Sequence, residues 1–396
     1  MNHFSYIILF ASVLVVLSVM AGKFFSRYGF STLLVTLGIG MLFGNGGKYD
    51  FDYNYPSLTL HISEIALCFI IFSGGFETQW NKFRPFLLKG IALATSGVLL
   101  TAFVLGMAVH YLLNWPFMES LLIGAIVSST DAAAVFSILE SSKLKLKNGI
   151  SETLQLESGT NDPMAYFLTT CICSVIVAPG SISYTEMAID FIQSMSLGFV
   201  SGWIVAVAIH WLIVKSKLKK GQNPVMLIST VLLLYSLNSI IGGSAFLSVY
   251  IAGIVLGNRD WPNRVLNINF FEGFSWLMET VLFLILGLQL YLYELDEILA
   301  EGLIISALLI FVARPFGTHG SLLMVKKFSW KDSAFISWVG LRGATPIVFA
   351  LIPVVHHIPS AHKIFNISFI IVITSILFQG TFLPKLAKWL SLENKS

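Results

Sequence analysis

Five ionisable residues lie within long apolar stretches of this chain: Asp131, Glu157, Asp162, Arg314 and Arg342. An ionisable side chain inside a membrane span costs roughly 2.5–3.5 kcal/mol on insertion, so each of the five is a candidate for function. Carboxylates grouped with hydroxyls are hard oxygen donors, which suit a hard cation that sheds its water and not a soft metal. The chemistry to expect is ion binding at membrane depth.

The first candidate, Asp131, follows three hydroxyl residues in the run Ser128-Ser129-Thr130-Asp131, in the middle of an apolar span. Serine and threonine hydroxyls compete for backbone hydrogen bonds and therefore weaken a helix. Backbone freed at this depth is tolerated only around a cavity. The run predicts a broken helix beside an ion site; the alternative is a seam of small hydroxyl residues that packs against another helix.

The next span carries the run from Glu157 to Asp162, followed by Pro163. Helical spacing places Ser158 and Asp162 on one face, and Glu157 and Asn161 on the adjacent one. A proline cannot donate to the carbonyl four residues before it, so that oxygen is also freed. This face offers a hydroxyl, a carboxylate and a carbonyl; the alternative is a purely structural polar network.

Arg342 lies between two glycines in Gly340-Leu-Arg-Gly343, and Pro346 follows. Glycine and proline that interrupt an apolar span are the sign of a discontinuous helix. A buried charge needs a partner, and we expect Glu157 to pair with Arg342 as a structural ion pair. Arg314 has no assigned partner; Glu157 or the free carbonyls of a broken helix are its candidates.

The amino-acid composition indicates the class of protein in which these residues lie. Of the 396 residues, 56% are hydrophobic and 11% are charged, whereas about a quarter of a soluble protein is charged. The mean hydropathy is +0.81. The chain is therefore an all-α polytopic membrane protein, which excludes a soluble enzyme, a disordered chain, a nucleic-acid-binding protein and a disulfide scaffold.

A transmembrane helix needs about 20 mostly apolar residues, and we expect about thirteen such spans. Their centres lie near Leu14, Leu37, Leu67, Leu100, Val127, Leu168, Val205, Leu232, Val249, Phe283, Leu309, Pro346 and Ile373. With this count, most of the 24 Lys and Arg residues fall on one side, which is then cytoplasmic. The N-terminus is expected outside and the C-terminus inside.

The thirteen spans divide into two six-helix halves that flank the seventh span. The interrupted spans are the fifth and the twelfth, which occupy corresponding positions in halves of opposite orientation, as in inverted-repeat transporters. The loops are short, so residues 1–396 are expected to form a single membrane transport domain without a soluble regulatory domain. A chain without a nucleotide-binding domain is not expected to be a pump driven by ATP.

At these residues the chain resembles the sodium/hydrogen exchanger family, in the cation:proton antiporter-1 branch typified by NhaP-type bacterial antiporters. The matching motifs are Ser129-Thr130-Asp131, the E-S-x-x-N-D run from Glu157 to Asp162, Arg314-Pro315 and Gly340-Leu-Arg-Gly343. They follow one another in the order and spacing of the family, and they lie in the expected spans.

The resemblance implies a homodimer in a bacterial plasma membrane. Its dimerisation part would comprise about 1–77 and 222–293, and its mobile ion-transport core about 86–178 and 298–390. The transported ions would be protons and Na⁺ or K⁺. The lipid bilayer is the surrounding solvent, and no cofactor and no nucleic acid are expected.

The resemblance also assigns roles to individual residues. The ion ligands would be the Asp131 and Asp162 carboxylates, the Ser158 hydroxyl and the Thr130 carbonyl. Asn161 would brace the broken segment. The supporting residues Glu157, Arg342 and Arg314 would not be ligands.

Two features depart from or refine the family pattern. Many members carry an acidic residue in the third span, where this chain has Ser73, and Glu77 lies one turn further on. The E-S-G-T-N-D-P-M run from Glu157 resembles the potassium/proton subgroup, whose members often carry a cytoplasmic regulatory domain. The sequence leaves the choice between sodium and potassium open.

The mechanism expected is alternating access with competition at Asp162. A carboxyl group drawn out of water needs either a proton or a cation to neutralise it. The mobile core would therefore carry its site from one side of the membrane to the other only when one of the two ions is bound. Asn161 stands where electrogenic relatives hold a second Asp. A single exchanging carboxylate predicts one proton per cation and electroneutral exchange.

Other functions were weighed against antiport. A passive cation channel also uses buried acids. An intramembrane aspartyl protease could use Asp131 and Asp162, although neither acid stands in the Y-D or G-x-G-D motif of those enzymes. A serine hydrolase at Ser244 would need a paired histidine, which the sequence does not place, and small-residue helix packing explains the run Gly242-Gly-Ser-Ala245 better. Three further acids, Glu64, Glu272 and Glu279, fall in or near spans and are candidates for positions at an interface.

Overall fold

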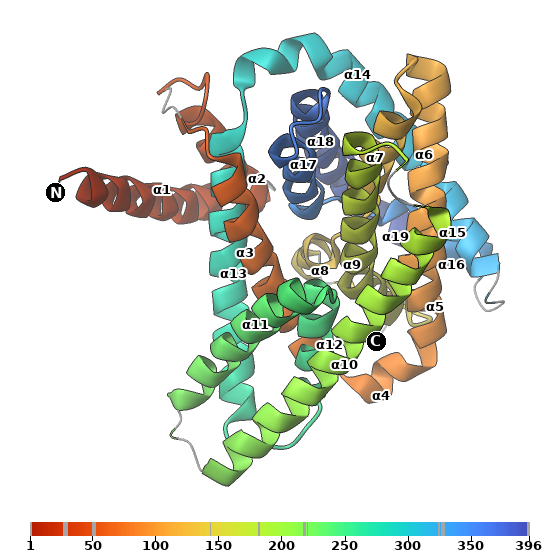
Figure 1. The fold of residues 1–396 in the computed structure, drawn as a ribbon. Coiled ribbons are helices and arrows are strands. Elements are labelled where there is room, and N and C mark those ends of the chain that lie inside the picture. Colours follow the sequence, from red (N-terminus) through yellow and green to blue (C-terminus); the bar gives the residue numbers. More distant parts are fainter. Residues whose placement is uncertain are drawn as a thin grey trace.

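The protein is a bundle of helices, as the composition predicts (Figure 1). The structure, a computed structural model, describes residues 2–26, 31–49, 53–142, 144–180, 183–216, 219, 221–323, 325 and 329–393. Within these residues the only β-type pairing is an isolated bridge between Leu146 and Glu393. The helices are α1 Asn2–Ser26, α2 Thr32–Phe43, α3 Pro56–Glu77, α4 Trp80–Phe83, α5 Leu87–Ala92, α6 Val98–Leu113, α7 Phe117–Ile126, α8 Ala132–Ser141, α9 Ile150–Val177, α10 Tyr184–Ser216, α11 Gln222–Ile241, α12 Ala245–Gly257, α13 Arg264–Gln289, α14 Leu295–Leu308, α15 Arg314–Leu323, α16 Trp330–Trp338, α17 Thr345–Val355, α18 Ala361–Thr374 and α19 Gly380–Trp389.

Many of these helices are long and apolar enough to cross a membrane. Seven candidate spans lie in the described part of the chain: Ile8–Phe25, Pro56–Glu77, Trp80–Leu113, Thr185–Ser216, Gln222–Ile241, Arg264–Gln289 and Ala361–Trp389. Shorter apolar helices, α2, α7, α12 and α17, add to them. The membrane-protein class is confirmed. Every predicted span centre falls in a helix or at a joint between two helices, and the count of thirteen stays a prediction.

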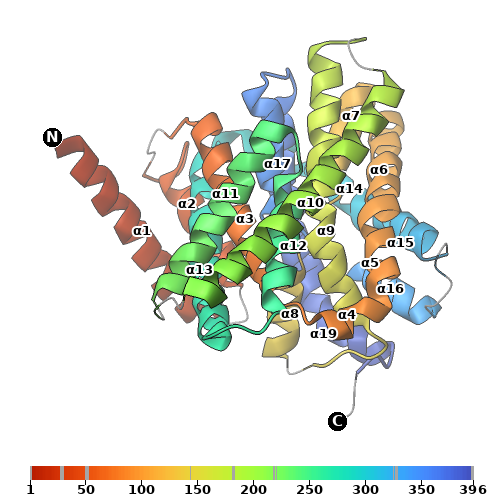
Figure 2. The ribbon, with the colours of Figure 1, turned by 60° about the horizontal axis from the view of Figure 1, so that its bottom comes forward.

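The helices gather on two sides of the bundle (Figures 1 and 2). On one side α3 packs against α12 and α13, and α2 packs against α13 and α1. On the other side α6 packs against α7, α14 against α18, and α15 against α16. The long helix α10 runs diagonally across the bundle, while α9 and α17 lie between the two sides (Figure 2).

Small residues allow α3 and α12 to approach closely. Gly253 and Gly257 are spaced as in a G-x-x-x-G pattern, and they face the backbone of Phe72 and Phe76. A Cβ atom at Gly253 would lie 2.5 Å from the carbonyl oxygen of Phe72, so no larger residue fits. Packing of this kind holds helices together in lipid, where the hydrophobic effect does not.

Three π-helical segments interrupt otherwise continuous helices among the described residues, and one of them, Ser375–Gln379, joins α18 to α19. Leu93–Gly97 joins α5 to α6, and Leu309–Ala313 joins α14 to α15. The π segment at Leu93–Gly97 contacts α15, and the one at Leu309–Ala313 contacts α6. These helices are the predicted fourth and eleventh spans, which correspond in the two halves, so the shared irregularity supports the predicted inverted repeat.

Candidate ion-binding site

Both predicted helix breaks are present, and they meet at the centre of the bundle. The helix α7 ends at Ile126 and α8 begins at Ala132, while α16 ends at Trp338 and α17 begins at Thr345. The amide of Asp131 donates to the carbonyl of Leu341 across the two non-helical segments, at 2.8 Å. The prediction of broken crossing helices is confirmed.

Arg342 lies just beyond the end of α7 and binds carbonyls of the broken segment. Its Nη1 donates to the carbonyl of Ser128 at 2.7 Å and also to that of Ser129. The C-terminal end of a helix carries partial negative charge, which stabilises a nearby cation. Arg342 is 1% exposed, and it makes no ion pair with any described residue. It is therefore held by the broken helix itself.

Asp131 lies at the beginning of α8, where the helix dipole favours an anion. Its Oδ1 accepts hydrogen bonds from the amides of Ala133 at 2.9 Å and Ala134 at 3.3 Å, as an N-capping residue does. Gly343 passes so close that a Cβ atom there would overlap the Asp131 carboxylate. Glycine at this position lets the second break approach the carboxylate.

Asp162 is the more enclosed of the two carboxylates assigned as ion ligands. It projects from α9, is 6% exposed, and its Oδ1 accepts a hydrogen bond from the hydroxyl of Ser129. The helix α9 stays continuous through Pro163. Because Ser129 belongs to the broken segment, this bond ties the carboxylate of an unbroken helix to the helix break.

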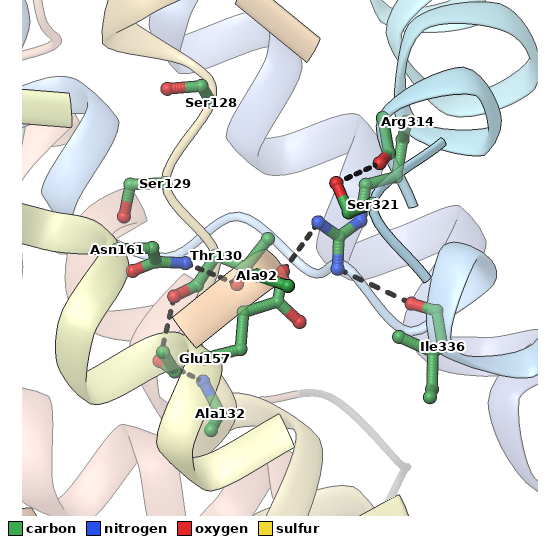
Figure 3. A network of polar contacts seen from close by, with 12 residues as sticks. Ala92, Ser128, Ser129, Thr130, Ala132, Glu157, Asn161, Arg314, Ser321 and Ile336 are labelled. Carbon is green, nitrogen blue, oxygen red and sulfur yellow. Dashed lines mark hydrogen bonds and ion pairs between the residues drawn. The ribbon is translucent and has the colours of Figure 1, made fainter. Parts of the chain in front are cut away.

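Ser158 and Asn161 hold the broken segment from the same helix. The Ser158 hydroxyl donates to the Thr130 carbonyl at 2.8 Å and accepts from the amide of Ala132 at 2.9 Å. The Asn161 amide donates to the Thr130 hydroxyl at 2.7 Å. Figure 3 shows the contact between Asn161 and Thr130. Two of the oxygens assigned as ligands, those of Ser158 and Thr130, thus lie against one another.

The buried ion pair of the site joins Glu157 to Arg314 and not to Arg342. Glu157 Oε1 lies 2.6 Å from Arg314 Nη1, and the two side chains are 0% and 2% exposed. Arg314 also donates from Nη2 to the carbonyl of Ile336, near the end of α16, at 3.4 Å (Figure 3). The expected Glu157–Arg342 pair is wrong, and Arg314 instead has both partners that were candidates for it.

The predicted ligands line one cavity. It has a volume of about 230 Å³, and its wall includes Thr130, Asp131, Ser158 and Asp162. These residues carry carboxylate, hydroxyl and carbonyl oxygens, which are ligands for a hard cation. Among the described residues, no group of three or more His, Cys, Asp or Glu side chains is placed to hold a transition metal.

Two further acids, Glu77 and Glu279, line the same cavity, and they also line a second cavity of about 560 Å³ next to it. Glu272 lines only this second cavity. Ser73, at the position that is acidic in many relatives, donates to Glu77 at 3.2 Å and does not line the first cavity. Acidic side chains therefore form a continuous path from the surface to the site.

Sequence reasoning did not assign a role to Ser129, although it quoted the residue in its motif. The three hydroxyls in a row signalled a break, but the side-chain directions in a non-helical segment do not follow a period. For Glu279 the signal was its place within an apolar span, and its contact with the site could not be read from spacing.

Comparisons with known proteins agree with this geometry. The sequence profile of the family described as "Sodium/hydrogen exchanger, transmembrane" matches residues 12–389. The K⁺/H⁺ antiporter NhaP of Alkalimonas amylolytica is 39% identical over 386 residues, which are 98% of this chain and 67% of that protein. The K⁺/H⁺ antiporter NhaP2 of Shewanella baltica (strain OS223) is 37% identical over 398 residues, which are 99% of this chain and 68% of that protein.

A solved structure shows the same fold. The sodium proton antiporter MjNhaP1 from Methanocaldococcus jannaschii superimposes with a TM-score of 0.86 at 22% identity, and the match covers 98% of this chain and 99% of that one. At this identity the likeness shows the architecture alone. The antiporter fold expected from the motifs is confirmed.

Proposed function

The chain belongs to the sodium/hydrogen exchanger family, and from this premise we propose that it exchanges K⁺ for protons across a membrane. The family consists of cation:proton antiporters, so the chain is a transporter and not an enzyme. The preference for K⁺ is supported by relatives at 39% and 37% identity that are named as K⁺/H⁺ antiporters. The sodium antiporter of the solved structure is 22% identical.

The observation that carries the proposal is the enclosed carboxylate of Asp162 in the same cavity as Asp131, Ser158 and Thr130. An isolated carboxylate away from water is unfavourable unless a proton or a cation compensates it. The two ions therefore compete for one group, and the competition couples their movements. Asn161 next to it is neutral, which supports a ratio of one proton per cation and electroneutral exchange.

The acidic path favours a state that is open to the cytoplasm. Glu272 and Glu77 are exposed, Glu279 is half-buried, and all three face the cavity that adjoins the site. Glu77 ends α3, shortly before Lys82 and Arg84. Basic residues near span ends stay in the cytoplasm, so the path would open on that side, with the N-terminus outside and the C-terminus inside.

We also propose a homodimer in a bacterial plasma membrane. Large apolar side chains are exposed along α1, including Leu9, Val13, Val16 and Met20. These face either lipid or a second copy, and α1 belongs to the predicted dimerisation part, 1–77 and 222–293. The core, 86–178 and 298–390, contains both helix breaks and α9, and it would move relative to the dimerisation part during transport.

The test is proton movement in everted vesicles from a bacterial strain that lacks its own antiporters. Adding KCl should release accumulated protons, NaCl and LiCl should do so less effectively, and Asp162→Asn should reduce the signal to that of vesicles without the protein. Asp296→Asn, the same change at an exposed aspartate, is the matched control and should behave as the wild type. Retained exchange in Asp162→Asn would remove this carboxylate from the mechanism.

Coupling and stoichiometry need a separate measurement. In sealed proteoliposomes an imposed voltage alone should not drive K⁺ uptake, because one-for-one exchange moves no net charge. Uptake driven by voltage would contradict electroneutral exchange. Flux without an opposing proton flux would indicate a passive channel.

A further inference from the structure

A second buried carboxylate lies outside the site described above. Glu64 on α3 is 6% exposed, and its two oxygens accept hydrogen bonds from the hydroxyls of Tyr166, at 2.9 Å, and Tyr235, at 2.8 Å. The only basic group within 4 Å in the described part of the chain is His61, whose Nδ1 lies 3.7 Å away and whose side chain is 65% exposed. A carboxylate at membrane depth with so little compensation is costly unless it serves an ion.

Glu64 lines a polar cavity of about 310 Å³. The wall also carries the hydroxyls of Thr170, Ser194 and Ser239 and the side chain of Asn238. Polar walls at this depth are tolerated where they face water or an ion, not lipid. The cavity is large enough to admit a partly hydrated monovalent cation.

This cavity lies beyond the ion site, toward the outer solution. Tyr166 is four residues after Asp162 on α9, which places it on the same helix face and about 6 Å further along the axis. The helices α3, α9 and α11, which bring the residues of the Glu64 cluster together, have their basic flanking residues at the opposite ends: Lys82, Lys147 and Lys219. By the distribution of basic residues, the cavity faces outward.

An aromatic cluster separates the two cavities. The ring of Tyr166 packs edge-on against Phe246 and Phe349, with ring centroids 5.2 Å and 5.5 Å apart. The outer cavity and the cavity at Asp162 have no lining residue in common. The outer path is therefore closed at Tyr166, in the same structure in which the acidic path on the other side adjoins the site.

We propose that Glu64 is an ion-binding residue of the outer path, which takes up the K⁺ or the proton that passes between Asp162 and the outer solution. This rests on the proposed function and on the proposed motion of the core. Tyr166 belongs to the core, whereas Glu64 and Tyr235 belong to the dimerisation part. When the core moves, Tyr166 withdraws its hydroxyl and its ring together, so the path opens as the carboxylate loses one of its two donors and becomes free to bind an ion.

The experiment measures the apparent KM for K⁺ separately at each face, in everted and in right-side-out vesicles. Glu64→Gln keeps the size and the oxygen acceptor but removes the charge, and it should raise the outer-face KM about tenfold, or about 1.4 kcal/mol. The inner-face KM should stay at the wild-type value. Glu301→Gln is the matched control, because Glu301 pairs with Lys363 and does not line this cavity; it should change neither KM.

A second variant distinguishes an ion-binding role of Glu64 from a purely structural one. Tyr166→Phe removes the hydrogen bond but keeps both the ring and the carboxylate, so its outer-face KM should stay close to that of the wild type. The same loss in Tyr166→Phe and Glu64→Gln, or an equal loss at both faces with a lowered Tm, would show a structural brace and overturn the proposal. An unchanged outer-face KM in Glu64→Gln would also overturn it. Failure of the wild type to exchange K⁺ would instead refute the proposed function.

Discussion

Loss of one partner of the Glu157–Arg314 pair should destabilise the protein strongly. The two groups lie 2.6 Å apart, with side chains 0% and 2% exposed. Removing one member of such a pair leaves an uncompensated buried charge, which costs about 3–5 kcal/mol. For a chain of 396 residues, at roughly 2 °C or less per kcal/mol, this corresponds to a fall in Tm of up to roughly 6–10 °C.

The charges can be removed with little change in shape by Glu157→Gln and Arg314→Met. The double variant leaves no buried charge at this position, so it should be less destabilised than the sum of the two single variants. The coupling energy should be about 2 kcal/mol or more, near the upper end of values for residues in contact. Thermal unfolding of the purified protein in detergent, followed for all four proteins, gives this number.

A parallel cycle with Arg342→Met tests the assignment of the partner. Arg342 is also buried, but its Nη1 donates to two backbone carbonyls, so its coupling to Glu157 should be clearly weaker. A coupling to Arg342 equal to or larger than that to Arg314 would refute the reasoning. It would restore the pairing expected from the sequence.

Three further predictions concern residues around the breaks and the helix packing. Gly343→Ala should raise the apparent KM for K⁺ in vesicles, because the new Cβ would displace the Asp131 carboxylate. An unchanged KM would show that the segment between α16 and α17 can move away from this carboxylate. Ser158→Ala should cost about 1–3 kcal/mol in thermal unfolding, since it leaves an amide and a carbonyl of the broken segment unpaired, and Ser158→Thr should recover part of the loss. Gly253→Ala should lower the Tm by overpacking α3 against α12, at about 1–3 kcal/mol; Gly38→Ala, at a helical glycine with open space around it, should not.

The helix breaks could be predicted from the sequence because their causes are local. Ser128, Ser129 and Thr130 disfavour a helix wherever they lie, and so do the glycines that flank Arg342. The shared face of Ser158 and Asp162 follows from the regular period of α9, which the structure keeps through Pro163. Local chemistry and helical period were sufficient for these parts of the site.

The partner of Glu157 could not be predicted in the same way. Arg314 directly follows the π-helical segment Leu309–Ala313, which adds a residue to one turn and rotates the helix beyond it. An apolar sequence does not indicate where such a π-helical segment occurs. The helix face on which the Arg314 side chain lies could therefore not be predicted. The hydrogen-bond partners of Glu64 could not be predicted for a similar reason, because Tyr166 and Tyr235 come from two other helices.

The hydrogen bond between the Asp131 amide and the Leu341 carbonyl uses main-chain atoms alone. Any amino acid except proline at position 131 can supply this donor, so side chains on both crossing segments can change during evolution while the junction itself persists. The four half-helices that end at this junction should then move as one rigid body. Variants that alter the ion preference therefore need not destabilise the ion-transport core.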